Sequence, residues 1–155
     1  QDAGRPFAEA VKLLQAQYPQ YSEAIRMYDE YWYKMLKCEF PESIALLKEL
    51  KSLGYGIYGL TNWSAEKIGY AFSNYEFFGL FDGIVVSGDE KVAKPDPKIY
   101  RILLERYGLV PGECVFLDDN ADNVKAAEAL GINAIRFDNI NNVKNNLASL
   151  LGRNL

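Results

Sequence analysis

Histidine is missing from this chain of 155 residues. Its absence excludes the Ser-His-Asp and Cys-His arrangements that activate nucleophiles, and every zinc site that depends on imidazole ligands. Only two cysteines are present, Cys38 and Cys114, and their spacing fits neither a CxxC motif nor a metal site. We expect both to be small buried hydrophobic residues without a disulfide. Any chemistry must therefore use carboxylates, lysine, hydroxyl groups and a hard metal ion.

Clustered positive charge and long apolar runs are missing as well. The net charge is −4, and no cluster of five or more Lys and Arg residues provides the electrostatic footprint of nucleic-acid binding. No apolar stretch approaches the roughly 18 residues of a membrane span, and no basic and apolar leader opens the chain. We therefore expect no nucleic-acid partner, no membrane span and a cytoplasmic protein.

The chain does contain enough apolar residues for a core, at 49% hydrophobic, and they fall into a regular pattern. From residue 55 on, short β-rich runs alternate with helix-sized segments. Apolar runs such as IVV and CVFL are typical of strands buried on both faces of a parallel sheet. The pattern predicts an α/β fold with a Rossmann-like open parallel sheet and flanking helices. The predicted strands are YGIYGLTN (55–62), GIVVSG (83–88), CVFLDD (114–119) and NAIRFD (133–138).

Helix signals between and before these strands support the same fold. Segments 42–54, 96–108 and 121–131 each have a helical pattern that stops at a glycine. The second of them also begins with Asp96 as a predicted N-cap and Pro97 as the first helical residue. Helices between consecutive strands are the crossovers that parallel pairing requires.

The first part of the chain differs from the rest. Residues 6–38 contain helix formers and many aromatics but no strand signal, and the step Pro41–Glu42 is the plausible boundary. We therefore divide the chain into a helical part, 1–40, and an α/β part, 41–155. An apolar stripe at helical spacing favours packing between helices, and a substrate lid is compatible with it. The stripe consists of Ile25, Tyr28, Trp32 and Met35.

Polar residues follow three of the predicted strands. The first strand ends in Thr61 and Asn62, the second leads to Lys94, and the third ends in the adjacent carboxylates Asp118 and Asp119. Ligands of open α/β sheets bind beyond the carboxyl ends of the strands, so these residues should face one crevice. We expect Thr61, Asn62 and Lys94 to bind a phosphorylated small molecule there.

Two adjacent carboxylates raise a question of charge. They repel each other unless a cation or hydrogen-bond donors lie between them. Carboxylates, water and substrate phosphate suit Mg²⁺, which makes Asp118 and Asp119 candidate metal ligands. Alternatively, the pair belongs to a solvated turn that only caps the following helix. We expect Lys94 to act on phosphate charge, so that its loss should leave folding nearly intact.

The order of LTNWS, AKPDPKIY and VFLDDNADNV resembles the haloacid dehalogenase superfamily of hydrolases over residues 55–138. The resemblance implies that Thr61 is a phosphate-binding hydroxyl and Lys94 the catalytic lysine. It also implies that Asp119 is a Mg²⁺ ligand and Asp118 a ligand or an outer-shell partner. Residues 6–40 look like the rear part of a helical cap. Many members of the family carry aspartate at the position of Asn123, which leaves the role of this residue open.

The first motif of that family is not found. It consists of a nucleophilic aspartate at the end of the first strand and a second aspartate two residues on, as general acid/base. Of the nine aspartates of this chain, no two are two residues apart, and Asp82 precedes its strand and is assigned to a turn. We expect a strand, its turn and one or two cap helices, roughly 30 to 50 residues, to be absent. Either the chain lacks its N-terminal part or the protein is a pseudoenzyme.

The expected function is that of a hydrolase of the haloacid dehalogenase (HAD) type. The resemblance implies a Mg²⁺-dependent phosphatase of small phosphorylated metabolites such as sugar phosphates, acting through an aspartyl-phosphate on the missing aspartate. A 2-haloacid dehalogenase is the alternative, although its reaction needs no divalent metal and a Ser or Asn would be expected in place of Asp119. A non-catalytic binding or scaffold domain is a further alternative, because the nucleophile is missing.

Overall fold

Four short parallel strands form the centre of the protein, at the positions that the sequence predicts. The computed structural model describes residues 1–153. Thr61 lies opposite Val86 in the first strand pair, and Asp118 lies opposite Arg136 in the second. Within the described residues, no hydrogen bonds join the two pairs, so the predicted sheet is present as two separate halves. The strands are β1 (Tyr58–Thr61), β2 (Gly83–Val86), β3 (Val115–Asp118) and β4 (Asn133–Arg136).

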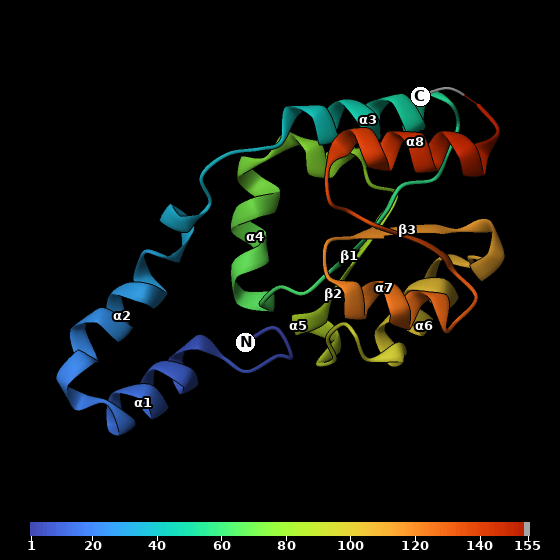
Figure 1. Ribbon diagram of the computed structural model, residues 1–155. Coiled ribbons are helices and arrows are strands. Elements are labelled where there is room, and N and C mark those ends of the chain that lie inside the picture. The colour runs from blue at the N-terminus through green and yellow to red at the C-terminus, as the bar shows by residue number, and fades with distance from the viewer. Residues whose placement is uncertain (154–155) are drawn as a thin grey trace.

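Helices cover both faces of the strands (Figure 1). On one face α3 (Pro41–Ser52) and α8 (Ile140–Leu151) lie side by side, and on the other α6 (Pro97–Tyr107) packs with α7 (Ala121–Glu128). This layered arrangement is the α/β class that the sequence predicts. The remaining elements of the α/β part are α4 (Ala65–Asn74), α5 (Ser87–Glu90) and the 3₁₀ turns Glu76–Leu80 and Pro111–Glu113.

Each helical layer has its own apolar core. The cluster under α3 and α8 consists of Leu46, Leu50, Ile57, Ile135, Val143 and Leu147. The cluster under α6 and α7 consists of Val85, Val92, Ile99, Tyr100, Leu103, Ala127 and Ile132. Both clusters include residues of the strands or of the segments next to them, so burial of apolar surface holds the two half-sheets between the helical layers.

Helix ends follow the local signals in the sequence. Asp96 caps α6 by accepting a hydrogen bond from the backbone N–H of Lys98 at 2.8 Å, and Gly108 ends that helix with a φ of 63°. Only glycine adopts such a positive φ without strain. The cap of α7 is Asn120, whose side chain accepts from the N–H of Asp122 at 2.8 Å. Neither aspartate of the adjacent pair is therefore the N-cap of this helix.

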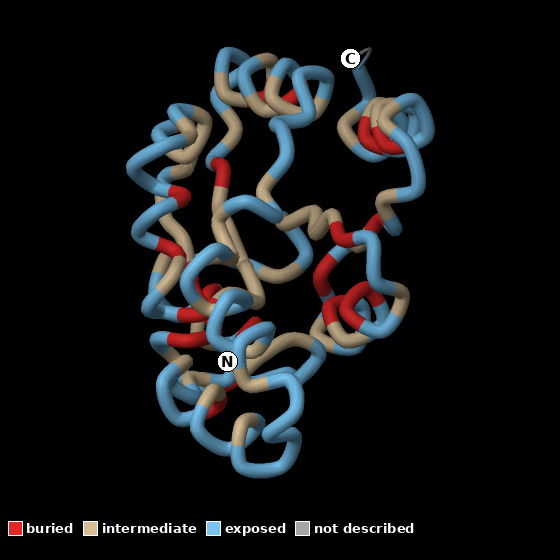
Figure 2. Tube along the Cα trace, turned by 90° about the vertical axis from the view of Figure 1, so that its left-hand side faces the viewer, coloured by how far each residue is buried: buried red, intermediate tan, exposed pale blue. Residues whose placement is uncertain are grey.

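The first part of the chain forms a helical hairpin that extends away from the strands (Figure 1). Its elements are α1 (Phe7–Gln17), the 3₁₀ turn Pro19–Tyr21, α2 (Ser22–Glu30) and the 3₁₀ turn Trp32–Met35. We call residues 7–35 the N-terminal hairpin. Figure 2 shows that its surface is mostly exposed, and Ala10 is its one buried residue.

The prediction of one continuous apolar stripe in this region is wrong. The helix ends at Glu30, so the spacing of 3.6 residues per turn is lost before Trp32. Tyr28 and Met35 are 60% and 53% exposed, whereas Trp32 is half-buried against the α/β part.

The prediction for the cysteines is confirmed in part. Both are free thiols, as expected. Cys38 is exposed, however, because it lies in the linker before α3, where no core is available to cover it. Cys114 is half-buried, and burial together with the charge of Glu113 raises the pKa of its thiol. Within residues 1–153, no helix combines the length and the apolar character needed to cross a membrane.

Candidate functional site

A chain of hydrogen bonds connects the carboxyl ends of β1 and β3. Asn62, directly after β1, accepts from the backbone N–H of Lys94 at 2.8 Å and donates from Nδ2 to the Lys94 carbonyl at 2.9 Å. The Lys94 ammonium in turn donates to Asp118 Oδ2 at 2.7 Å. Three of the predicted site residues, from three separate segments, are therefore brought together.

Asp118 is the most enclosed member of this group. Its side chain is 6% exposed and that of Lys94 is 10% exposed. Its other oxygen, Oδ1, accepts from the N–H of Asn120 and from Nδ2 of Asn123, both at 2.9 Å. Burial raises the pKa of Asp118, but the hydrogen bonds from Lys94, Asn123 and Asn120 outweigh it, and the pKa lies below the ordinary range. Asp118 is thus an ionised carboxylate with both oxygens occupied by donors.

Asn123 gains a definite contact here. As an amide it can donate to Asp118, whereas an ionised aspartate at this position could only accept. Its backbone carbonyl accepts a 2.8 Å hydrogen bond from the hydroxyl of Tyr100. Burial and the charge of Asp118 raise the pKa of Tyr100, which keeps this hydroxyl a neutral donor. Sequence reasoning missed Tyr100, because the pattern of α6 marks it only as an apolar residue of the helix's inner face.

Asp119 and Thr61 contrast with this buried network. Asp119 is exposed, and Arg136 Nε donates to its backbone carbonyl at 3.2 Å. Thr61 is half-buried at the last position of β1. Within residues 1–153, neither the Asp119 carboxylate nor the Thr61 hydroxyl makes a hydrogen bond. Both groups are therefore free to meet a ligand.

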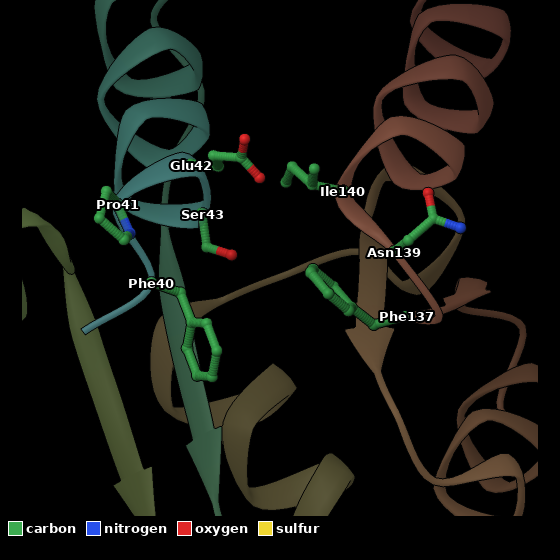
Figure 3. A pocket seen from close by; sticks show the side chains of 7 residues that line it. All are labelled: Phe40, Pro41, Glu42, Ser43, Phe137, Asn139 and Ile140. Atoms are coloured by element: carbon green, nitrogen blue, oxygen red, sulfur yellow. The ribbon is translucent and has the colours of Figure 1, made fainter. Parts of the chain in front are cut away.

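Two adjoining hollows share Phe40, Ser43 and Phe137, and one of them is lined by the acidic pair. One, of about 440 Å³, is lined by Asp118 and Asp119 together with Phe40, Ser43, Leu117 and Phe137. The other, of about 510 Å³, lies between the starts of α3 and α8, and Figure 3 shows Phe40 and Phe137 on its two sides. Neither hollow is lined by Thr61 or Lys94. The acidic pair therefore opens onto a largely apolar space, whereas Lys94 contacts Asp118 without lining that space.

The residues present offer part of a metal site. No group of three or more His, Cys, Asp and Glu side chains is placed to hold a metal within residues 1–153. Mg²⁺ is commonly bound by one or two carboxylates, with waters and substrate phosphate as the other ligands. Asp119 fits that requirement as a free carboxylate, whereas the oxygens of Asp118 already accept from Lys94, Asn120 and Asn123.

Comparison with known proteins identifies the family. The sequence model of haloacid dehalogenase-like hydrolases matches residues 3–131, and the chain belongs to this family. It is 32% identical over 106 residues to (S)-2-haloacid dehalogenase 4A of Burkholderia cepacia, which covers 68% of this chain and 46% of the relative. It is 36% identical over 88 residues to a sesquiterpene phosphatase of Aspergillus oryzae, covering 57% and 45%. The chain thus spans about half the length of these two relatives.

Solved structures agree with this assignment. A HAD family enzyme from Bacteroides thetaiotaomicron, crystallised with magnesium and inorganic phosphate, is 29% identical with a TM-score of 0.57. That similarity covers 63% of this chain and 52% of the bacterial one. The relatives of this chain therefore include both dehalogenases and phosphatases.

Proposed function

We propose that the intact protein is a Mg²⁺-dependent phosphatase of small phosphorylated metabolites such as sugar phosphates. The observation that carries this proposal is the acidic pair at the end of β3, where Asp119 is free while Asp118 is bound to Lys94. Removal of a halide leaves no phosphate charge to neutralise, so a free second carboxylate would serve no purpose there. The magnesium and phosphate bound to the Bacteroides enzyme support this choice.

Each residue of the site has a role in this proposal. The Thr61 hydroxyl and the Asn62 and Lys94 side chains bind and orient the phosphate oxygens. Asp118 holds the Lys94 ammonium in place through the 2.7 Å hydrogen bond to its Oδ2. Asp119 is the metal ligand, and bound Mg²⁺ supplies neutralisation of the phosphate charge.

The nucleophile, in this proposal, is an aspartate on a strand outside these 155 residues. β1 and β3 each have one unpaired edge, and a strand between them would end beside Asn62, Lys94 and Asp118. A carboxylate oxygen of that aspartate attacks phosphorus, the bond from phosphorus to the alcohol oxygen breaks, and a general acid protonates the alcohol. Water then attacks the phosphorus of the aspartyl-phosphate, which releases phosphate and restores the carboxylate.

Phosphate release from a panel of phosphorylated metabolites, measured on the complete protein, tests this function. Release should stop when EDTA removes the divalent metal and return when Mg²⁺ is added. Release that EDTA leaves unchanged would contradict the metal-dependent reaction. The 155-residue chain alone should release no phosphate, since the nucleophile is outside it.

A dehalogenase is the second candidate, and the similarity to the Burkholderia dehalogenase favours it. The same complete protein should then release halide from 2-haloacids, with or without EDTA. If neither phosphate nor halide is released, the remaining candidate is a binding or scaffold domain that has no catalytic activity.

A further inference from the structure

The N-terminal hairpin is tied to the α/β part by two consecutive residues of α4. At the start of the hairpin, the N–H of Phe7 donates to Glu66 Oε2 at 2.7 Å. Near the end of α2, Asp29 accepts from the Lys67 ammonium through Oδ1 at 2.6 Å and through its carbonyl at 3.2 Å. Within the part of the chain that the structure describes, no other hydrogen bond or ion pair joins the hairpin to residues beyond its linker.

The Lys67 ammonium contacts two aromatic rings of the hairpin in addition to Asp29. Its ammonium lies 4.5 Å from the ring centre of Phe7 and 5.9 Å from that of Trp32. Its side chain is 19% exposed, and that of its partner Asp29 is 27% exposed. A partly shielded ion pair with aromatic rings beside the cation is stronger than an exposed pair.

Beyond the contacts of α4 with Phe7 and Asp29, aromatic packing holds the end of the hairpin, where Trp32 and Tyr33 lie 5.6 and 5.5 Å from the ring centre of Tyr70. Ala10 is its one buried residue among those described, and no hairpin residue belongs to the apolar clusters, including the one under α4 formed by Ile68, Ala71 and Val86. Segments with few buried apolar contacts open at low free-energy cost, independently of global unfolding. The contacts around Lys67, together with the aromatic packing on Tyr70, therefore decide how often the hairpin leaves the α/β part.

The hairpin touches the candidate site through a pair of tryptophans. Trp32 meets Trp63 edge to face, with ring centres 6.4 Å apart and an angle of 87°. Trp63 directly follows Thr61 and Asn62, and its backbone N–H donates to Ser87 Oγ at 3.0 Å. The position of the hairpin is thus linked to the end of β1 and the loop after it, which carry two of the proposed phosphate-binding residues.

We propose that Lys67 is a latch that holds the N-terminal hairpin against the loop after β1. With Lys67 bound to Asp29, Trp32 rests on Trp63. When the latch is released, the hairpin swings away about the linker of residues 36–40 and Trp63 loses its partner. The latch rests on the proposed function only in that Trp63 directly follows Thr61 and Asn62, the proposed phosphate-binding residues, and the latch itself is tested without any substrate.

The 155-residue chain contains an optical reporter of this motion, because Trp32 and Trp63 are its two tryptophans. In Lys67→Met the near-ultraviolet circular dichroism of the pair should fall and tryptophan emission should shift to the red. Amide exchange in α1 and α2 should rise by about five- to tenfold, while the amides of the four strands keep their protection. Lys67→Arg preserves the charge and should keep the closed state.

A matched control is Lys125→Met, which removes an exposed ion pair with Asp122 on α7, 3.7 Å long, and should change neither signal. The proposal would be overturned if Lys67→Met had the same spectra and the same amide exchange as the wild type. It would also be overturned if Lys67→Arg were as open as Lys67→Met. If Lys67→Met also loses strand protection, Asp29→Asn repeats the test from the hairpin side. A functioning latch in a protein that releases no phosphate would reject the proposed function alone.

Discussion

At the scale of single residues, the ion pair between Lys94 and Asp118 changes what the loss of Lys94 should do. The sequence suggested that folding would remain nearly intact, but Lys94→Ala leaves a buried carboxylate without its cation. Removing one partner of a buried pair typically costs about 3 to 5 kcal/mol, and the slight exposure of this pair points to the lower end. Urea unfolding should show this loss, whereas Lys98→Ala, an exposed lysine, should change stability by less than about 0.5 kcal/mol.

The double variant Lys94→Ala with Asp118→Asn separates this effect from lost packing. Because the unpaired charge is then removed as well, part of the stability should return. If the single variant Lys94→Ala were as stable as Lys98→Ala, the ion pair would contribute nothing to the stability of the fold.

Asp119 should behave in the opposite way. Asp119→Asn removes one of two adjacent negative charges and no helix cap, since Asn120 caps α7. The metal-free variant should therefore be at least as stable as the wild type, a compromise that functional sites often show. Millimolar Mg²⁺ should raise the melting temperature of the wild type, by preferential binding to the folded state, and leave that of the variant unchanged.

Asp122→Asn is the control for this measurement, because it removes an exposed charge from the first turn of the same helix. It should keep the wild-type response to Mg²⁺. A wild type that does not respond to Mg²⁺ would remove Asp119 from the metal site.

Asp118 also predicts a dependence of stability on pH. Its pKa is lower in the folded state than the value of about 3.9 expected in the unfolded chain, so the folded state binds fewer protons. Its stabilising contribution is complete above that unfolded value and is lost as the pH falls through the lower folded pKa. Unfolding in urea between about pH 6 and pH 2 should show a smaller acid loss for Asp118→Asn than for wild type. Parallel pH curves for the two proteins would contradict the lowered pKa.

At the scale of elements, α7 depends on a residue that also supports the site. Asn120→Ala removes the cap of α7 and should lower the free energy of unfolding by about 1 kcal/mol. Asn120→Ser, which keeps a capping oxygen, should recover most of it in the same denaturation assay. An Asn120→Ala protein as stable as wild type would show that the helix needs no cap here.

Elements set by local signals could be predicted, and those set by long-range contacts could not. Asp96, Pro97 and Gly108 define α6 within a short stretch of sequence, and the four strands follow from short apolar runs. By contrast, Trp32 takes its place from contacts with Trp63 and Tyr70, far away in the sequence. No periodicity indicates such contacts, so the end of α2 at Glu30 was missed.

The same distinction applies to the site. Thr61, Asn62 and the acidic pair stand at strand ends that the sequence marks, and Lys94 lies in the loop before α6, after the second strand. Asp118 is buried and fully hydrogen-bonded, whereas Asp119 is exposed. This difference depends on the positions of Lys94 and Asn123 in the fold, which the local sequence around the two aspartates does not reveal.

At the scale of the whole molecule, the strands are split into two separate pairs. Unpaired strand edges leave backbone donors and acceptors without partners, and they readily accept another strand. An extended peptide with alternating apolar residues should raise the melting temperature and protect amides of β1 and β3 from exchange. The same peptide with a central proline cannot complete the pairing and should do neither. Protection confined to α1 and α2 would show that the peptide binds elsewhere.

The bonds from Asn62 to Lys94 and from Lys94 to Asp118 cross from one half of the sheet to the other. These hydrogen bonds bridge the gap that the strands leave between the two half-sheets. Mild denaturant, or crowding of the Phe40 and Phe137 side chains, could widen the gap between the half-sheets slightly. The hydrogen bonds of Lys94 would then break while the apolar clusters under the helices stay packed. Under the proposed function, phosphate binding should then fade at a lower denaturant concentration than helical structure.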